Sequence, residues 1–425
     1  MDMQLTSLHG LADGVNMLTL PNGLRVAWER TPTETVAAML RTRFGSGHER
    51  AGQEGWAHLL EHIIMSGGSR RFPREESAAV RRKLGTYNMQ TGWNDTTFTA
   101  DFLAERTPLF LEFLSDLAFH PLLREQDLVT ERTVAEREIA ESISQPGFQD
   151  YSEFTRACFG EGQYTYAKLG RPETLALASV GDMRSLHARG YGASNMDLIL
   201  VGGLPEGIED LVRASFEHAP AGEPTPAPFQ SAAPIRDVTT LVRPAPERAN
   251  GDEETSAEFY LALSAPPSWH QDSVSINMLA YLLGGDPDSL LFRKVREEKG
   301  LAYRIQAVYD GTDDGLAQVQ AFVPPSRWEE VLSAVFDEFQ NLKARPIDED
   351  EFHAFKDILR YSMAKSSERN ESRLQRVRHM LDGELALETM AEVMEEMTPL
   401  DLQDAARNYL STEDYVLLVR DPSVR

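Results

Sequence analysis

The chain has 425 residues, of which 41% are hydrophobic and 26% charged, so it can bury large apolar cores and does not have the composition of a disordered protein. Its 67 acidic residues against 42 Lys and Arg give a net charge of −25, which repels phosphate backbones and argues against a nucleic-acid partner. The single cysteine, Cys158, excludes an intrachain disulfide and a cysteine-rich metal site and favours a reducing compartment.

The sequence starts with Met1-Asp2-Met3 and shows neither the basic nor the apolar region of a signal peptide. No apolar run approaches the roughly 18 residues that a membrane helix needs. We therefore expect a cytoplasmic protein that does not bind a membrane. The length exceeds what one hydrophobic core usually supports, so we expect at least two domains.

The predicted elements of the two halves follow the same order. The first half opens with a strand at residues 36–44 and a helix at residues 55–65, and the second half with a strand at 258–264 and a helix at 274–283. An alternating segment at residues 97–102 is typical of a strand with one covered face. Strands that alternate with helices predict an α+β fold.

A short repeat supports a duplication. A helix ending in Ala-Arg-x-Tyr precedes a buried strand near the end of each half, and Arg407 and Val419 follow Arg189 and Val201 by 218 residues each. A segment rich in Pro and Ala, residues 219–236, predicts a linker. We therefore predict two tandem homologous domains at residues 1–218 and 237–425.

The sequence His58-Leu59-Leu60-Glu61-His62 stands out within the predicted helix at residues 55–65. Positions i and i+4 lie on one face of a helix, so both imidazoles can reach one tetrahedral metal ion, and Glu61 falls on the same face. The order His-x-x-Glu-His is the inverse of the commoner zinc-protease motif. An amphipathic helix that happens to carry two histidines is the alternative interpretation.

A catalytic zinc site needs a third protein ligand and leaves its fourth position to water. A predicted helix at residues 127–139 offers Glu131 and Glu138, which are seven residues apart and project from one face. Taken alone, this charged segment is more typical of a solvated helix with surface salt bridges.

Together, these motifs make the chain similar to the inverted zinc metallopeptidases, the family of insulysin, pitrilysin and the mitochondrial processing peptidase, and especially to its short bacterial members. That family carries a Glu in an ER-x-V-x-x-x-E-[IM] helix some seventy-odd residues after HxxEH, and here ERTVAEREI places Glu138 76 residues after His62. The resemblance implies that His58, His62 and Glu138 bind one Zn²⁺ per chain. It also implies that Glu131 is a catalytic residue that orients the site.

The resemblance extends to substrate binding. Asn88, Met89 and Thr91 stand where the family has Asn-Ala-x-Thr on an edge strand that pairs with an extended peptide. Met89 replaces the usual Ala, and its larger side chain is expected to narrow the cleft. Without the resemblance, Asn88 is better interpreted as a turn residue after Gly85.

The second half matches the family signature LRExxGLAY. The resemblance implies that Arg296 and Tyr303 bind the substrate backbone and polarise the scissile carbonyl. Leu290 stands where many relatives have Arg. The helix predicted at residues 274–283 carries neither His nor Glu, so only the first half can bind the metal.

The implied function is a zinc-dependent endopeptidase for unfolded or extended peptides, with Glu61 as the general base. Two tandem α+β domains, each a mostly antiparallel sheet covered by helices, would form half of a clamshell, which implies a homodimer or a heterodimer with a related metal-less subunit. The acidity of the chain suits basic peptides. Two alternatives share the fold: a non-catalytic scaffold or partner subunit, and a maturation protease for one precursor peptide.

Overall fold

The computed structural model describes residues 14–145, 147–160, 169–225, 235–245, 255–311, 315–383 and 387–424. Contacts divide the chain into two compact units. The first comprises Met1–Glu141, Tyr166–Phe229 and Ala364–Asp382, and the second comprises Ser142–Thr165, Gln230–Met363 and Gly383–Arg425. Part of the predicted linker, residues 226–234, lies outside the described residues.

Within the described residues, the sheet of the first unit has six strands in the order β1-β2-β6-β3-β5-β4. The strands span Val15–Thr19 (β1), Arg25–Arg30 (β2), Thr35–Thr42 (β3), Thr86–Thr91 (β4), Thr96–Leu103 (β5) and Met196–Gly202 (β6). β2 and β6 are parallel, and every other neighbouring pair is antiparallel. β3 and β6 are buried over nearly their whole length, as apolar strands covered on both faces are, whereas β4 lies at an edge.

The helices of the first unit pack on this sheet around a core of Leu, Ile and Phe side chains. They span Trp56–Gly67 (α1), Arg74–Arg81 (α2), Thr107–Phe119 (α3), Glu125–Ser144 (α4), Pro172–Leu177 (α6), Val180–Gly190 (α7) and Ile208–Phe216 (α8), with short 3₁₀ turns at Ser46–His48 (η1), Ala104–Arg106 (η2) and Ala193–Asn195 (η4). The strands predicted at residues 36–44 and 97–102 and the helix predicted at 55–65 are confirmed to within a few residues.

The second unit repeats the topology of the first. Among the described residues its sheet has the order β7-β11-β8-β10-β9, with strands at Thr239–Pro244 (β7), Ala257–Ser264 (β8), Arg304–Asp310 (β9), Leu316–Val323 (β10) and Val416–Asp421 (β11). β7 and β11 are parallel, as β2 and β6 are, and the other pairs are antiparallel. Its helices span Ser273–Gly284 (α9), Trp328–Ala344 (α10), Glu349–Ser366 (α11), Leu387–Glu396 (α13) and Pro399–Tyr409 (α14), and Phe292–Glu298 (η5) is a π-helix. Two similar α+β halves are therefore confirmed.

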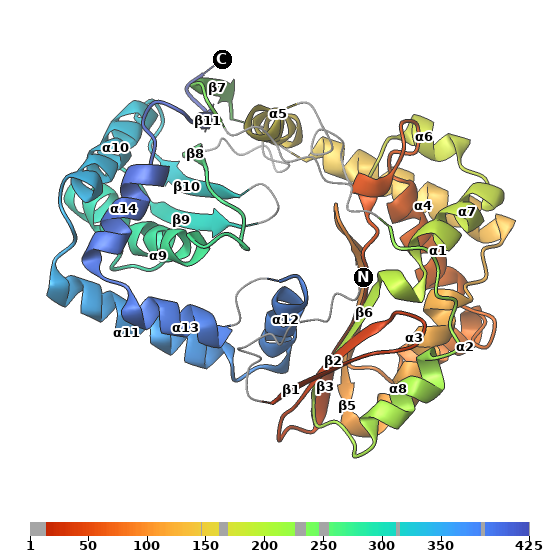
Figure 1. The fold of residues 1–425 in the computed structure, drawn as a ribbon. Helices are drawn as coiled ribbons and strands as arrows, with labels where there is room; N and C mark the ends of the chain where they lie inside the picture. Colours follow the sequence, from red (N-terminus) through yellow and green to blue (C-terminus); the bar gives the residue numbers. More distant parts are fainter. Residues whose placement is uncertain are drawn as a thin grey trace. The chain divides into compact units, whose positions relative to one another are not determined.

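Each half of the sequence supplies one helix to the sheet of the other half. α5 (Phe148–Phe159) contacts β7 and β11, and Phe154 and Cys158 pack on the apolar side chains of that sheet. α12 (Asn370–Leu381) contacts β3 and β6 (Figure 1). Its Leu374 and Val377 pack on the first sheet. Domains that are continuous in sequence, such as 1–218 and 237–425, do not describe this exchange. Each helix buries its apolar face on a sheet that is remote in sequence.

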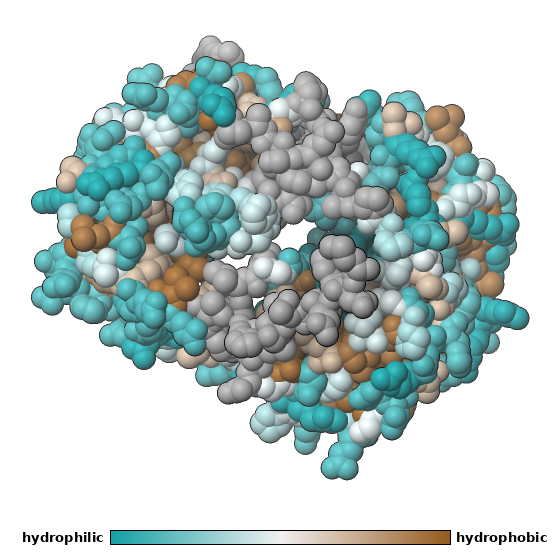
Figure 2. Space-filling view, in the orientation of Figure 1, coloured by the Kyte–Doolittle hydropathy of each residue, from teal (hydrophilic) through white to brown (hydrophobic). Residues whose placement is uncertain are grey.

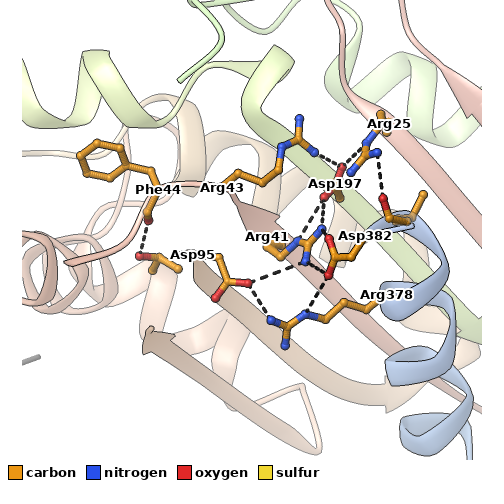
Figure 3. Close-up of polar contacts among 10 residues, drawn as sticks. Arg25, Arg41, Arg43, Phe44, Asp95, Asp197, Arg378 and Asp382 are labelled. Carbon is orange, nitrogen blue, oxygen red and sulfur yellow. Dashed lines mark hydrogen bonds and ion pairs between the residues drawn. The ribbon is translucent and has the colours of Figure 1, made fainter. Parts of the chain in front are cut away.

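A cluster of buried charges joins the end of α12 to the first sheet (Figure 3). Asp197 on β6 is fully buried and accepts from Arg25 at 2.6 Å, Arg43 at 2.6 Å and Arg41 at 2.7 Å. Burial alone would raise the pKa of Asp197, but the three guanidinium groups lower it. Arg41 also binds Asp382, the residue that follows α12, with nitrogen–oxygen distances of 2.6 and 2.5 Å. Charge pairing therefore compensates the desolvation of these side chains.

The same cluster reaches the turn between β4 and β5. Nη2 of Arg378 on α12 lies 2.7 Å from Oδ2 of Asp95, which is in that turn (Figure 3).

Hydrophilic side chains dominate the face shown in Figure 2, as expected from the 26% of charged residues. No helix of the described part of the chain combines the length and the apolar character needed to cross a membrane.

Candidate metal centre

The N-terminus of α1 is fixed by a side chain that precedes the helix. The carboxyl of Glu49 accepts the backbone N–H groups of Gly55, at 2.9 Å, and Ala57, at 2.7 Å. Gly55 has φ of +91°, and a Cβ there would meet the carbonyl oxygen of Leu169 at 2.5 Å, so only glycine fits. The opposite face of α1 buries side chains such as Leu59 and Ile63. The helix can therefore present its histidines in only one orientation.

The structure brings together the three predicted zinc ligands. Nε2 of His58 and Nε2 of His62 are 3.1 Å apart, and Oε2 of Glu138 on α4 lies 3.5 Å from the first and 3.3 Å from the second. Ligand atoms bound tetrahedrally to zinc are about 3.4 Å apart, given bonds of about 2.0–2.1 Å. The observed triangle thus fits a zinc ion. Within the described residues, no other group of three His, Cys, Asp or Glu meets the same geometric requirement.

The charges around the two histidines also suit a cation. Burial, and next the neighbouring His62, lower the pKa of His58 to about 4, so His58 is neutral at pH 7 and keeps a nitrogen lone pair for a metal. Burial would lower the pKa of His62 as well, but the carboxylates of Glu131, Glu138 and Glu61 raise it. Negative charge is therefore concentrated where a divalent cation would bind.

Glu131 supports the site from behind His62. Its Oε2 lies 3.5 Å from Nδ1 of His62, the ring nitrogen that does not face Glu138, and its Oε1 lies 3.9 Å from Nη2 of Arg74. Burial would raise the pKa of Glu131, but the contact with His62 and the charge of Arg74 lower it. A carboxylate in this position sets the orientation of a ligating imidazole and makes it more basic.

Glu61 is almost fully buried, at 6% exposure, beside the proposed ligands. Burial raises its pKa, and its hydrogen bonds with Thr91 and the charge of His62 oppose that rise. Oγ1 of Thr91 donates to Oε2 of Glu61 at 2.6 Å. A carboxylate with a raised pKa suits a group that must both accept and release a proton.

The predicted edge strand is confirmed as β4, but its side chains alternate in a way that changes one expectation. Met89 is 4% exposed and packs into the core of the first unit. The prediction that its larger side chain narrows a substrate cleft is therefore wrong, because that side chain points away from solvent. Thr91 is buried on the same face, whereas Asn88 is exposed on the opposite face.

The other predicted substrate-binding residues belong to the second unit. Arg296 is exposed on the π-helix η5, with its guanidinium 4.4 Å from the centre of the Phe292 ring. Tyr303 is 65% exposed and immediately precedes the edge strand β9. Leu290 packs against the apolar core of its own unit. The roles of Arg296 and Tyr303 stay predictions that depend on the resemblance.

Sequence reasoning missed two supports of this site. Glu49 precedes α1 by several residues, and its only signal was an acidic side chain close to a helix N-terminus, where carboxylates are favoured. The hydrogen bond from Thr91 to Glu61 joins residues on separate elements, a strand and a helix. Thr91 lies two residues from Met89 on β4 and shares its buried face, but nothing in the sequence named Glu61 as its partner.

Comparisons with known proteins identify the family of this chain. The family described as "Insulinase (Peptidase family M16)" matches residues 25–158, and "Peptidase M16 inactive domain" matches residues 178–359. An uncharacterized zinc protease of Streptomyces coelicolor is 26% identical over 409 residues, covering 95% of this chain and 88% of that protein. An uncharacterized zinc protease of Bacillus subtilis is 26% identical over 419 residues, covering 96% and 98%.

A solved protease from Helicobacter pylori has the same fold, with a TM-score of 0.84 and 19% identity over 96% of this chain and 99% of that one. A duplicated α+β fold with a His-x-x-Glu-His helix in its first half defines a class of zinc metallopeptidases and their relatives. Within that class, this chain belongs to the insulinase family, peptidase family M16, and resembles its short bacterial members.

Proposed function

We propose that this chain is a zinc-dependent endopeptidase that cleaves unfolded or extended peptides. The observation that carries the proposal is the triangle of His58, His62 and Glu138, whose spacing fits zinc, with the carboxylate of Glu61 beside it. The relatives named zinc proteases support the choice of metal.

Each residue of the site has a defined task in this proposal. His58, His62 and Glu138 would hold the zinc ion, and Glu131 would keep the ring of His62 in place. Bound zinc would acidify a water molecule and polarise the peptide carbonyl. Glu61 would take the proton of the attacking water and deliver it to the leaving amine.

The substrate would bind as an extended strand on the edge of the first sheet. β4 pairs with β5 on one side, and its exposed residue Asn88 remains available to a peptide by β-augmentation. Arg296 and Tyr303 would contact the peptide backbone, as the resemblance implies. The net charge of −25 favours basic peptides.

The active form in this proposal is a dimer, either a homodimer or a heterodimer with a related metal-less subunit. We infer no nucleic-acid partner, because the chain is strongly acidic. A reducing compartment, predicted from the single cysteine, stays a prediction.

The test combines metal analysis with cleavage. Purified protein is assayed for zinc and for cleavage of a quenched, extended basic peptide with and without a chelator. We expect about one zinc per chain and chelator-sensitive cleavage. Glu61→Gln should keep zinc and lose turnover, and Glu138→Gln should lose zinc. Glu136→Gln on the same helix, away from the triangle, is the matched control and should behave as wild type.

Three outcomes would separate the proposal from its alternatives, and the first of them contradicts it. Protein that binds no zinc would favour a non-catalytic scaffold. Protein that binds zinc but cleaves only after a second subunit is added would favour a partner-dependent enzyme, and cleavage of one peptide alone would favour a dedicated maturation protease.

A further inference from the structure

Thr91 holds the carboxylate of Glu61 from a separate element of the fold. Its Oγ1 lies 2.6 Å from Oε2 of Glu61. Both residues are almost fully buried, at 6% exposure each. An ionised carboxylate can only accept, so the Thr91 hydroxyl must donate, and a hydroxyl–carboxylate distance of 2.6 Å is typical of a charge-assisted hydrogen bond.

This hydroxyl is not free for a substrate. Along β4 the buried face carries Met89 and Thr91, whereas Asn88 and Gln90 face the other way and are exposed. A peptide that pairs with the edge of β4 would meet the backbone and the exposed side chains. The Thr91 side chain points instead into the first unit, toward α1.

The turn that follows β4 fixes the position of Thr91. Gly92 donates its N–H to the carbonyl of Asp95 at 2.7 Å, and the N–H of Ser46 donates to the carbonyl of Gly92 at 3.0 Å. The side chain of Asp95 is held in turn by Arg378 at 2.7 Å. The turn next to Thr91 is therefore held by Ser46 through Gly92 and by Arg378 through Asp95.

We propose that Thr91 is a positioning residue for Glu61, holding the carboxylate in the orientation from which it accepts the proton of the attacking water. The inference rests on the proposed peptidase function. Without the hydroxyl, the buried carboxylate would rotate and lose a donor that stabilises its ionised form. A general base contributes about 10²- to 10⁴-fold, and small displacements lose much of that.

The test compares Thr91→Val with Thr91→Ser. Valine keeps the shape of threonine and removes the hydroxyl, whereas serine keeps the hydroxyl. We expect Thr91→Val to lower kcat about 10- to 100-fold, with KM within about twofold and zinc content unchanged. Thr91→Ser should recover most of kcat. Thr133→Val, at an exposed threonine of α4 whose hydroxyl donates to the carbonyl of Val129, is the control and should match wild type.

A second readout does not depend on activity. Thr91→Val and Glu61→Gln should give non-additive shifts in Tm when combined, because each removes one partner of the same hydrogen bond. Additive shifts would overturn the inference. It would also be overturned by full activity in Thr91→Val, by a change in KM alone, or by loss of zinc.

Failure of the proposed peptidase function would give a different pattern of results. Wild-type protein that binds no zinc and cleaves no peptide, with Glu61→Gln indistinguishable from it, overturns the peptidase function and the role of Thr91 with it. Active wild type with a normal Thr91→Val variant overturns the role of Thr91 alone.

Discussion

The buried charge cluster predicts a large loss of stability on Asp197→Asn. The amide keeps the shape of the carboxylate but removes the charge that three arginines share. Arg25 and Arg43 are about one-third exposed, at 33% and 34%, and can turn to water, whereas Arg41 is 3% exposed and cannot. The charge stranded by the substitution is therefore mainly that of Arg41.

The expected loss of stability follows from the single charge that the substitution strands. Removing one partner of a buried ion pair costs about 3–5 kcal/mol, and Arg41 keeps Asp382 as a second partner, so we expect about 3 kcal/mol. That is a large share of the roughly 5–15 kcal/mol that stabilises a typical protein. The loss should appear first in α12, because Arg41 binds Asp382 directly after it.

The assay is urea unfolding combined with amide hydrogen exchange, since a chain of two units need not unfold in one step. We expect a lower unfolding midpoint and faster exchange in the peptide that contains residues 370–382. Glu209→Gln, which breaks an exposed pair with Arg213, is the control and should leave the unfolding midpoint unchanged. An unchanged midpoint with full protection of α12 would refute the reasoning.

Three further predictions follow from buried side chains. Met89→Ala should lower the free energy of unfolding by about 2–5 kcal/mol without changing KM, because it opens a cavity in the core and not in a cleft; a changed KM at unchanged stability would contradict this. Burial lowers the pKa of His187 to about 4, so the stability that depends on neutral His187 is complete above pH 6.5 and is lost as the pH falls toward 4. Urea midpoints at pH 7 and pH 4.5 should differ less in His187→Gln than in wild type, and equal differences would exclude His187 as a cause. Glu49→Ala should destabilise α1 by about 1 kcal/mol and weaken zinc retention against a chelator, whereas Glu54→Ala, whose carboxylate accepts from Gly52 and not from α1, should do neither.

Local patterns in the sequence were enough for several elements of each half and for the pairing of His58 with His62. Hydrophobic periodicity and helix geometry act over a few residues, so they can be evaluated without the fold. Local patterns did not identify the third proposed zinc ligand. Glu138 is 76 residues from His62, and from the residues alone its helix was more typical of a solvated surface. Only the resemblance selected it.

The exchange of α5 and α12 was not predictable, because an apolar helix face does not specify which sheet it will cover. Leu374 and Val377 are compatible with any apolar surface, and their packing on the first sheet depends on the tertiary fold. The Met89 error had another origin. The prediction rested on the alanine that relatives have at this position, which does not show on which face of the strand the side chain lies.

Because α12 packs on the first sheet, the position of the proposed base, Glu61, depends on both halves of the sequence. Arg378 on α12 holds Asp95, which lies in the turn after β4, and that turn places Thr91 against Glu61. The second half of the sequence therefore supports Glu61 although it supplies no metal ligand. A fragment of residues 1–218 would lack α12, leave the apolar face of the first sheet uncovered and deprive Arg41 of Asp382. The two halves of the sequence thus cannot be cut apart between residues 218 and 237 without removing support from the proposed metal centre.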